Sequence, residues 1–132
     1  MMRKIKFRAQ EKESKEWIYG AYQSSAPDKL FATYPHDLPF EMIIPETVGE
    51  FTEMLDANNK NIWEDDILEN QQQDGIYKRC RVGRRNGMWV VNYRDGGFVS
   101  LWWALENCNL AIVGNAFDNP DLLEGWINNA RA

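Results

Sequence analysis

The sequence predicts a mainly β protein, a barrel or sandwich of short strands that ends in one short helix. Three observations lead to this fold class. Apolar and polar residues alternate with a period of two near the N-terminus, an Asn-Gly pair joins two such runs near position 86, and helical spacing is clear only near the C-terminus. At 132 residues the chain is long enough for one domain with its own core.

The first 22 residues are predicted to form a hairpin. Ile5, Phe7 and Ala9 alternate with basic residues at positions 4, 6 and 8, which is typical of a strand with one buried face and one basic face in water. The alternation resumes over residues 17–21 after a polar connection. Prolines at positions 27, 35, 39 and 45 favour loop over residues 24–45, because proline lacks an N–H and restricts the residue before it.

Residues 48–75 predict two strands separated by turns. A short strand is expected over Val48–Thr52, and the Asn-rich stretch 56–61 is typical of a turn. Ile62 and Trp63 anchor the next segment, and a strand begins at residues 67–68. The three glutamines at 71–73 are too few for low-complexity behaviour and indicate a loop.

Residues 76–93 predict a second hairpin with a computable register. Asn86-Gly87 is the strongest short signal for a two-residue type I′ turn. With that turn, Cys80 faces Tyr93, and Val82 faces Val91. The apolar set then shares one face and comprises Cys80, Val82, Trp89, Val91 and Tyr93. The other face carries Arg79, Arg81, Arg85 and Arg94.

The remaining residues predict one turn, two strands and a helix. Asp95, Gly96 and Gly97 form the turn, and strands follow over Phe98–Leu101 and Leu110–Val113. Residues 102–106 fit either a short helix or an irregular corner. Near the end, Asn119 is predicted to cap a helix with Pro120 at its first position, because apolar residues then recur at i and i+4.

Composition excludes several classes of protein. The formal net charge is −5, which argues against general polyanion binding, and one His with two Cys provides no usual metal set or disulfide framework. Cys80 and Cys108 are expected to be reduced thiols. No apolar run has the length of a membrane span, and residues 1–10 do not form a signal core, so a soluble cytoplasmic protein without membrane association is expected.

Three stretches carry a family resemblance: IKFRA at the start, VGEFTEMLDANNKNIWEDDIL in the centre and AIVGNAFDNPDLLE near the end. Their order and spacing resemble the YopX family of small proteins encoded by bacteriophages and prophages. Four places depart from the family pattern. Gln10 replaces a Trp, residues 53–55 replace Gly-Leu-Lys, and Asn59 and Asp65 stand where glycines are usual.

The resemblance implies a single compact domain over residues 1–132, built of coiled β-sheets. It comprises an N-terminal hairpin and loops over 1–59, an SH3-like barrel over 60–117 and a C-terminal helix over 118–132. Asp66-Ile67-Leu68 occupies the place of the Gly-Asp-apolar step that commonly opens such barrels. The resemblance implies no biochemical activity, and a fold alone does not supply one.

The charged residues fall into two opposite blocks. Residues 41–74 carry ten acids and one base, and residues 76–94 carry six bases and no acid. The acidic Glu64, Asp65 and Asp66 lack the alternating oxygen donors of a cation loop, so no metal site is predicted there. Asp66 is instead expected to accept backbone N–H bonds at the entrance of the strand.

The basic block is the candidate interaction surface, formed by Arg79, Arg81, Arg85 and Arg94, with Tyr77 on the same side. Two interpretations are open. The arginines could track phosphates while Tyr77 stacks on a base, which predicts a nucleic-acid-binding module. The favoured interpretation is that the hairpin pairs with the acidic segment, in the same chain or in a neighbouring subunit.

The sequence contains no catalytic constellation. His36 beside Asp37 is a weak candidate for a general base, and no nucleophile elbow or phosphate loop is present. Core positions are predicted for most of Trp63, Trp89, Trp102, Trp103 and Trp126. If Trp102 and Trp103 are both exposed instead, one of them would mark a subunit or partner interface. The predicted function is therefore non-catalytic and cofactor-free: a phage or prophage accessory protein that acts by self-association, as a homo-oligomer, or by binding a host or phage protein.

Overall fold

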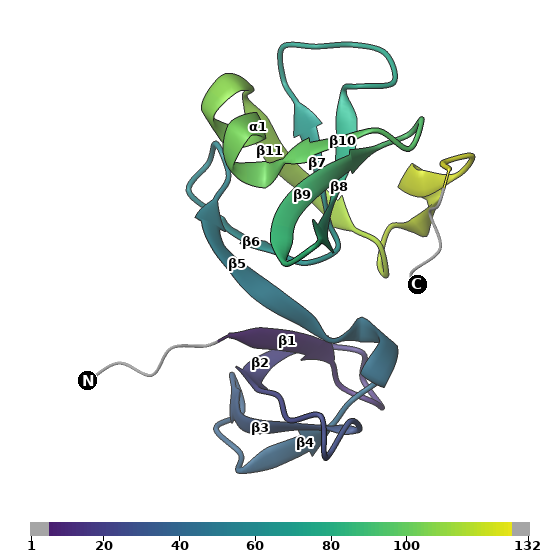
Figure 1. The fold of residues 1–132 in the computed structure, drawn as a ribbon. Coiled ribbons are helices and arrows are strands. Elements are labelled where there is room, and N and C mark those ends of the chain that lie inside the picture. The colour runs from purple at the N-terminus through teal and green to yellow at the C-terminus, as the bar shows by residue number, and fades with distance from the viewer. Residues whose placement is uncertain (1–5, 128–132) are drawn as a thin grey trace. The chain divides into compact units, whose positions relative to one another are not determined.

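The computed structural model describes residues 6–127, which form antiparallel strands with one short α-helix (Figure 1). The mainly β fold class is thereby confirmed. The chain divides between Phe51 and Thr52 into two compact units. The prediction that residues 1–132 form a single domain, with its internal borders at 59 and 117, stays a prediction.

The first unit is built on strands in the order β4-β3-β2-β1-β5. Their bounds are β1 Phe7–Gln10, β2 Trp17–Ala21, β3 Lys29–Tyr34, β4 Phe40–Met42 and β5 Gly49–Leu55, with a 3-10 helix, η1, at Pro45–Thr47. The predicted hairpin is confirmed, since Ala9 pairs with Ile18 across β1 and β2. Both residues are fully buried and form a core with Leu30 and Ile43.

Two predictions for this unit are wrong. Residues 24–45 are not mostly loop, because the prolines lie at the ends of elements: Pro39 immediately precedes β4, and Pro45 begins η1, where no N–H is needed. Arg8 does not face water, since it is 7% exposed with its guanidinium 4.4 Å from the Trp17 ring centre. Ile5 and Lys4 lie outside the described residues.

The second unit contains a sheet in the order β10-β9-β8-β7-β11. Its strands are β7 Asp66–Asn70, β8 Arg79–Arg85, β9 Met88–Tyr93, β10 Phe98–Ser100 and β11 Leu110–Asn115, preceded by β6 Asn61–Trp63, which neighbours β5. Between residues 6 and 127 the pairing leaves β10 and β11 as sheet edges, so no closed barrel is found and the SH3-like arrangement stays a prediction. The core comprises Ile62, Leu68, Cys80, Val82, Val91, Leu101, Ala104 and Leu110.

The second hairpin confirms the predicted turn and register. Asn86 and Gly87 have φ of 51° and 79°, as a type I′ turn requires, and Cys80 lies opposite Tyr93 with Val82 opposite Val91. Positive φ also explains why glycine is usual at two positions where this chain departs from the family pattern. Asn59 and Asp65 have φ of 61° and 71°, a conformation in which glycine has no steric cost.

The helical segments differ from the prediction in one case. The open choice at 102–106 is resolved as a helix, α1 Leu101–Asn107, whose start Ser100 caps by accepting the Trp103 N–H at 3.0 Å. The expected C-terminal helix is wrong for the described residues, which hold only a four-residue 3-10 helix, η2 Pro120–Leu123. The predicted N-cap hydrogen bond is absent, because the Asn119 side chain accepts the Asn115 N–H instead. Gly125, at φ 79°, has a conformation that ends a helix. Residues 128–132 of the predicted helix lie outside the described part.

None of the helices between residues 6 and 127 is both long and apolar enough to cross a bilayer.

Candidate interaction surface

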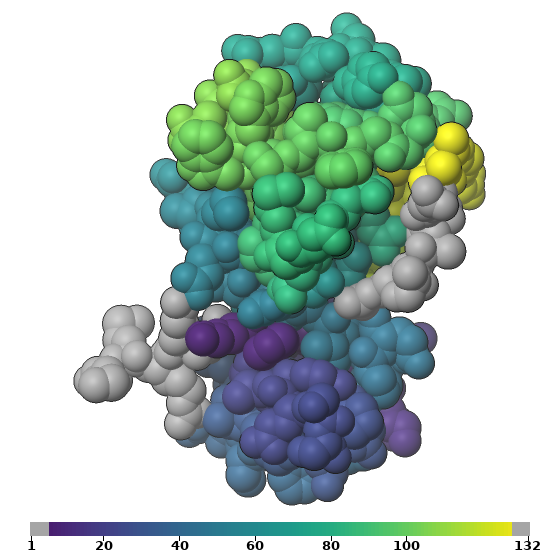
Figure 2. Space-filling view, in the orientation of Figure 1, coloured from purple at the N-terminus to yellow at the C-terminus, as the bar shows by residue number. Residues whose placement is uncertain are grey.

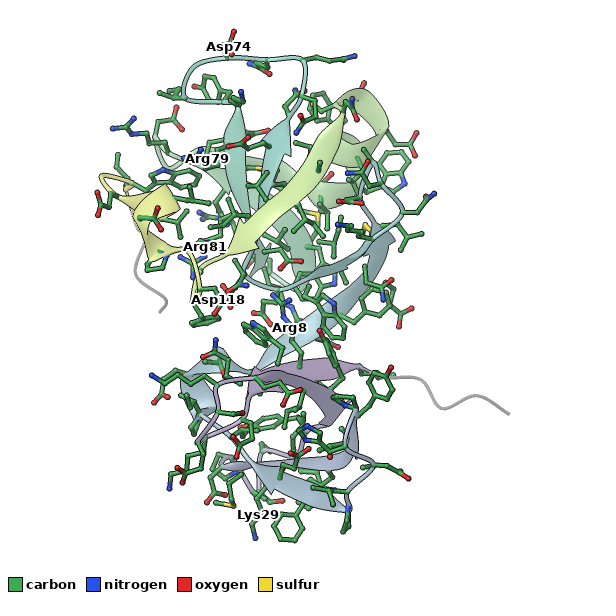
Figure 3. All side chains as sticks on the ribbon, turned by 180° about the vertical axis from the view of Figure 1, so that it is seen from behind. Arg8, Lys29, Asp74, Arg79, Arg81 and Asp118 are labelled. Carbon is green, nitrogen blue, oxygen red and sulfur yellow. The ribbon has the colours of Figure 1, made fainter. Side chains whose placement is uncertain are left out.

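Arg79 is bound within the second unit. It lies opposite Glu69 on the neighbouring strand β7, and its Nε and Nη2 reach Glu69 Oε2 at 3.0 and 2.6 Å. Its Nη1 donates to the Leu122 carbonyl at 3.3 Å, which ties β8 to η2. Figure 3 shows Arg79 beside the yellow η2 segment. Arg79 is therefore both an ion-pair partner and an anchor for the chain after β11.

Arg81 forms a buried ion pair. Its Nη2 lies 3.0 Å from Asp65 Oδ1, with the two side chains 11% and 6% exposed. Asp65 lies in the tight turn between β6 and β7, and its own N–H donates to the Val82 carbonyl. A carboxylate so deeply buried needs a cation beside it, since desolvation of an unpaired charge is costly. Arg81 thus balances the acidic turn and is largely shielded from an external phosphate.

The arginines at the end of the hairpin lie on aromatic rings. The guanidinium of Arg84 is 4.3 Å from the Trp89 ring centre, and that of Arg85 is 4.1 Å from the Phe98 ring centre. Arg85 also donates to Asn92 Oδ1 at 3.0 and 3.2 Å. Both residues remain exposed, so their charge still faces solvent while their planes cover apolar surface.

Tyr77 is held by an aromatic neighbour and an acid, whereas Arg94 is exposed. The Tyr77 ring packs edge-on against Tyr93, with ring centres 5.2 Å apart. Its hydroxyl donates to Asp95 Oδ2 at 2.6 Å, and this hydrogen bond raises the pKa of Tyr77 and lowers the pKa of Asp95. Arg94 is exposed, and its carbonyl accepts the Ile127 N–H. Arg94 therefore keeps an exposed charge, whereas Arg79, Arg81 and Arg85 are each held by neighbours in the second unit.

These contacts support the favoured interpretation of the charge blocks. Glu69 and Asp65 belong to the acidic segment 41–74, and they pair with Arg79 and Arg81 of the basic hairpin in the same chain. The acidic cluster has structural roles as well. As predicted, Asp66 accepts a backbone N–H, that of Trp63, at 2.7 Å from Oδ2.

His36 lies in the first unit and bridges two glutamates. Its Nδ1 is 2.7 Å from Glu41 Oε1 and its Nε2 is 3.1 Å from Glu16 Oε2. The hydrogen bond to Glu41 is the main cause that raises the pKa of His36. An imidazole held between two carboxylates favours its protonated form, so this arrangement stabilises a cation rather than preparing a general base.

The tryptophans divide between core and surface, which corrects the expectation that most of them are core. Trp63 is buried, whereas Trp102 and Trp103 are 64% and 48% exposed. Helix α1 turns Leu101 and Ala104 into the core, so the two intervening residues point outward. Figure 2 shows the α1 residues, in light green, at the surface of the second unit. The sequence predicted an interface here only if both tryptophans are exposed. That exposure depends on the helix, which the sequence left open.

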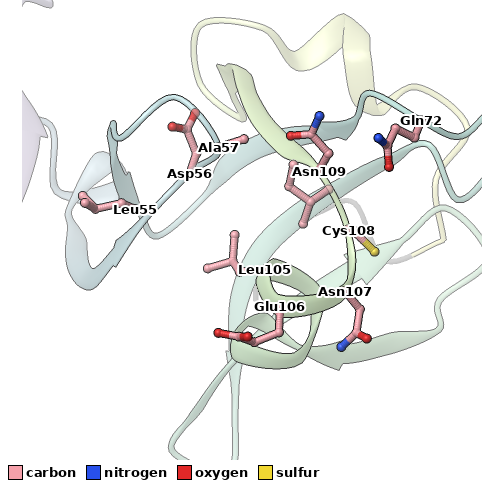
Figure 4. Close-up of a pocket in the computed structure, with 10 residues that line it drawn as sticks. Leu55, Asp56, Ala57, Gln72, Leu105, Glu106, Asn107, Cys108 and Asn109 are labelled. Atoms are coloured by element: carbon pink, nitrogen blue, oxygen red, sulfur yellow. The ribbon is translucent and has the colours of Figure 1, made fainter.

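The second unit also has a cavity of about 380 Å³ beside the end of α1, lined by residues 55–57, Gln72 and residues 105–110 (Figure 4). Its polar groups are mostly amides. Asp56 is committed to the fold, since its carboxylate accepts the N–H groups of Asn58, Lys60 and Ile112. Glu106 is the other lining carboxylate, so the cavity offers hydrogen bonds without an acid–base pair.

The comparisons find one family model and a similar solved structure. A family model described as YopX protein matches residues 6–124. Among solved structures, the crystal structure of protein EF1440 from Enterococcus faecalis is similar, with 20% identity and a TM-score of 0.49, over 93% of this chain and 100% of that chain. No curated protein matches the chain.

Proposed function

We propose that this chain, which belongs to the YopX protein family, acts without catalysis, by binding other protein chains, copies of itself included. One observation carries the proposal: two adjacent tryptophans on α1 are exposed. Large aromatic residues are enriched in protein interfaces and dominate their energetics. The internal ion pairs of Arg79 and Arg81 support the same proposal, because they reduce the charge available to a polyanion.

The size of the surface indicates a reversible association. A tryptophan side chain has a surface of about 250 Å². Because Trp102 is 64% exposed and Trp103 is 48% exposed, the two together leave about 280 Å² for a partner to cover. At about 25 cal/mol/Å² this area supplies about 7 kcal/mol before the cost of association, which is at least about 4 kcal/mol. When two copies bury this surface against each other the gain doubles to about 14 kcal/mol. An association cost of about 8 kcal/mol then leaves about 6 kcal/mol, which corresponds to a dissociation constant of tens of micromolar.

Light scattering after size exclusion tests self-association. The mass of the wild type is expected to rise above 15.4 kDa as the loading concentration passes about 100 μM, and Trp102→Ser/Trp103→Ser is expected to stay monomeric. Tyr34→Ser is the matched control, since Tyr34 is 59% exposed in the first unit. A monomeric wild type at every concentration, or a double variant that associates equally well, would refute self-association through α1.

The finer features of the prediction belong to the same proposal. An accessory role in phages or prophages and a cytoplasmic location rest on the family resemblance and the composition. The SH3-like character of the second unit is supported by its five short antiparallel strands and its central type I′ hairpin. The absence of an acid–base pair from the cavity beside α1 supports a non-catalytic role.

Nucleic-acid binding is the second candidate, favoured by the exposed Arg84, Arg85 and Arg94. Titration of labelled DNA and RNA at several salt concentrations tests it. Each phosphate contact adds about −0.7 to −0.9 to the slope of log K against log salt, so three contacts predict a slope near −2 to −3. A flat salt dependence excludes this candidate, and Arg85→Ala provides the variant whose slope should decrease by about one contact.

A further inference from the structure

A second cavity of the second unit lies where β8 and β9 meet the chain that follows η2. It has a volume of about 270 Å³ and is lined by Gly75, Ile76, Lys78, Arg79, Arg94 and Trp126. Two of these residues belong to the predicted arginine row, whereas Lys78 and Trp126 enter the site only through the fold. The hydrogen bond from Arg79 to the Leu122 carbonyl brings η2 to this place.

The cavity is positively charged. Among residues 6–127, six line the cavity, of which three are cations and none is an acid. Two acids pair with these cations: Glu69 holds Arg79 on the sheet, and the carboxylate of the fully exposed Asp74 is 3.9 Å from the Lys78 ammonium. An exposed pair at that distance contributes little, so Lys78 keeps its charge available. Arg94 forms no ion pair with any residue between 6 and 127.

The backbone holds the aromatic wall in position. The Ile127 N–H donates to the Arg94 carbonyl at 3.1 Å, and the Trp126 N–H donates to the Leu123 carbonyl at 3.2 Å. Gly125, at φ 79°, brings the chain so close that a Cβ there would be 3.3 Å from Arg94 Nη2. Trp126 is therefore fixed next to a guanidinium that the rest of the described chain leaves unpaired.

We propose that this cavity binds the phosphate group of a nucleotide, with Trp126 in contact with the base. Guanidinium groups match phosphate oxygens in geometry and charge, and an indole face stacks on any base. A volume of about 270 Å³ is below the range of drug-sized pockets, which favours one nucleotide unit over a dinucleotide. The site is distinct from Trp102 and Trp103 and does not depend on the proposed binding of protein chains, and it shares Arg94 with the nucleic-acid candidate.

Isothermal titration calorimetry of the full chain tests the site with adenosine 5′-monophosphate, with adenosine and with inorganic phosphate. The monophosphate is expected to bind more tightly than either part. Arg94→Ala is expected to weaken its binding at least about tenfold, because a charged hydrogen bond is lost. Arg84→Ala is the matched control, since Arg84 is exposed outside the cavity, and it is expected to bind like the wild type.

Two further measurements sharpen the result. Trp126→Phe keeps an aromatic ring and is expected to bind the monophosphate within a fewfold of the wild type, whereas Trp126→Ser loses the preference for monophosphate over inorganic phosphate. A 5′-phosphorylated hexanucleotide distinguishes two ligands. If it competes with the monophosphate, the site takes the phosphorylated end of a nucleic-acid strand, and if it does not compete, the site takes a free nucleotide. Circular dichroism confirms that each variant is folded.

The proposal is overturned if the monophosphate fails to bind at millimolar concentration, if adenosine binds equally well, or if Arg94→Ala and Arg84→Ala behave alike. Trp102→Ser/Trp103→Ser is expected to bind the monophosphate like the wild type. A chain that does not self-associate can therefore still bind the nucleotide, and a chain that does not bind the nucleotide can still self-associate through α1.

Discussion

Replacing Arg81 by alanine is the change for which the structure predicts the largest loss of stability. It leaves the Asp65 carboxylate, whose side chain is 6% exposed, without the guanidinium 3.0 Å away. Removing one partner of a buried ion pair costs about 3–5 kcal/mol, because the remaining charge is desolvated without compensation. A typical domain is stable by only about 5–15 kcal/mol, so this single change removes a large share.

A second substitution identifies the cause of that loss. In Arg81→Ala/Asp65→Gly the buried charge is absent, and glycine also relieves the cost of about 1 kcal/mol that a side chain meets at φ 71°. The double variant is therefore expected to be more stable than Arg81→Ala alone, despite having two substitutions. The coupling free energy between the two positions is expected to reach about 2–3 kcal/mol.

Urea unfolding followed by tryptophan fluorescence provides the free energies of unfolding. Five of the six tryptophans lie beyond residue 51, so the signal reports mainly the second unit. With a slope of about 1–3 kcal/mol/M, the midpoint of Arg81→Ala should decrease by about 1–5 M. Arg94→Ala, at an exposed site without an ion pair between residues 6 and 127, is the matched control and should change the free energy by less than about 1 kcal/mol. A loss below about 1 kcal/mol for Arg81→Ala, or a double variant less stable than the single one, would refute the reasoning.

Three further predictions concern other parts of the chain. The raised pKa of His36 means that its stabilising contribution is complete below its ordinary value of 6.5 and is lost as the pH rises through the higher folded value. The melting temperature of the wild type should therefore exceed that of His36→Ala more at pH 6 than at pH 8, and an equal difference at both would contradict this. Burial raises the pKa of Cys80 to about 12, so at pH 8 a thiol reagent should modify the half-buried Cys108 first and Cys80 only on unfolding, as peptide mass spectrometry would show. Gly87→Ala, at φ 79°, should destabilise the hairpin turn by about 1–2 kcal/mol in thermal unfolding, and a neutral result would argue against the type I′ turn.

Local signals in the sequence predicted the hairpins well. Asn86-Gly87 sets a turn whose geometry depends on two residues, and the register of β8 and β9 follows from it by counting. The prolines misled because their effect is positional: Pro39 and Pro45 forbid a strand or helix interior but suit the start of an element. The i,i+4 pairs after Pro120 predicted a helix that Gly125 does not allow to continue.

The candidate surface depended on tertiary structure that alternation does not reveal. The face that carries Arg81 was predicted to be in water, yet Ile67 lies beside Arg81 on that face and is fully buried, as is Val90. In a sheet that is buried on both faces, alternation no longer separates a buried face from an exposed one, and the prediction relied on that separation. In the same way, the exposure of Trp102 followed from the formation of α1, which the sequence left open.

The central claim is that the tryptophans of α1 form the contact surface. The most direct test is fluorine NMR of the chain labelled with 5-fluorotryptophan, recorded at increasing protein concentration and assigned by single substitutions of each of the six tryptophans. We expect the signals of Trp102 and Trp103 to shift with concentration and that of the buried Trp63 to stay unchanged. Shifts confined to other tryptophans, or six signals that do not change while the mass of the particle increases, would contradict it.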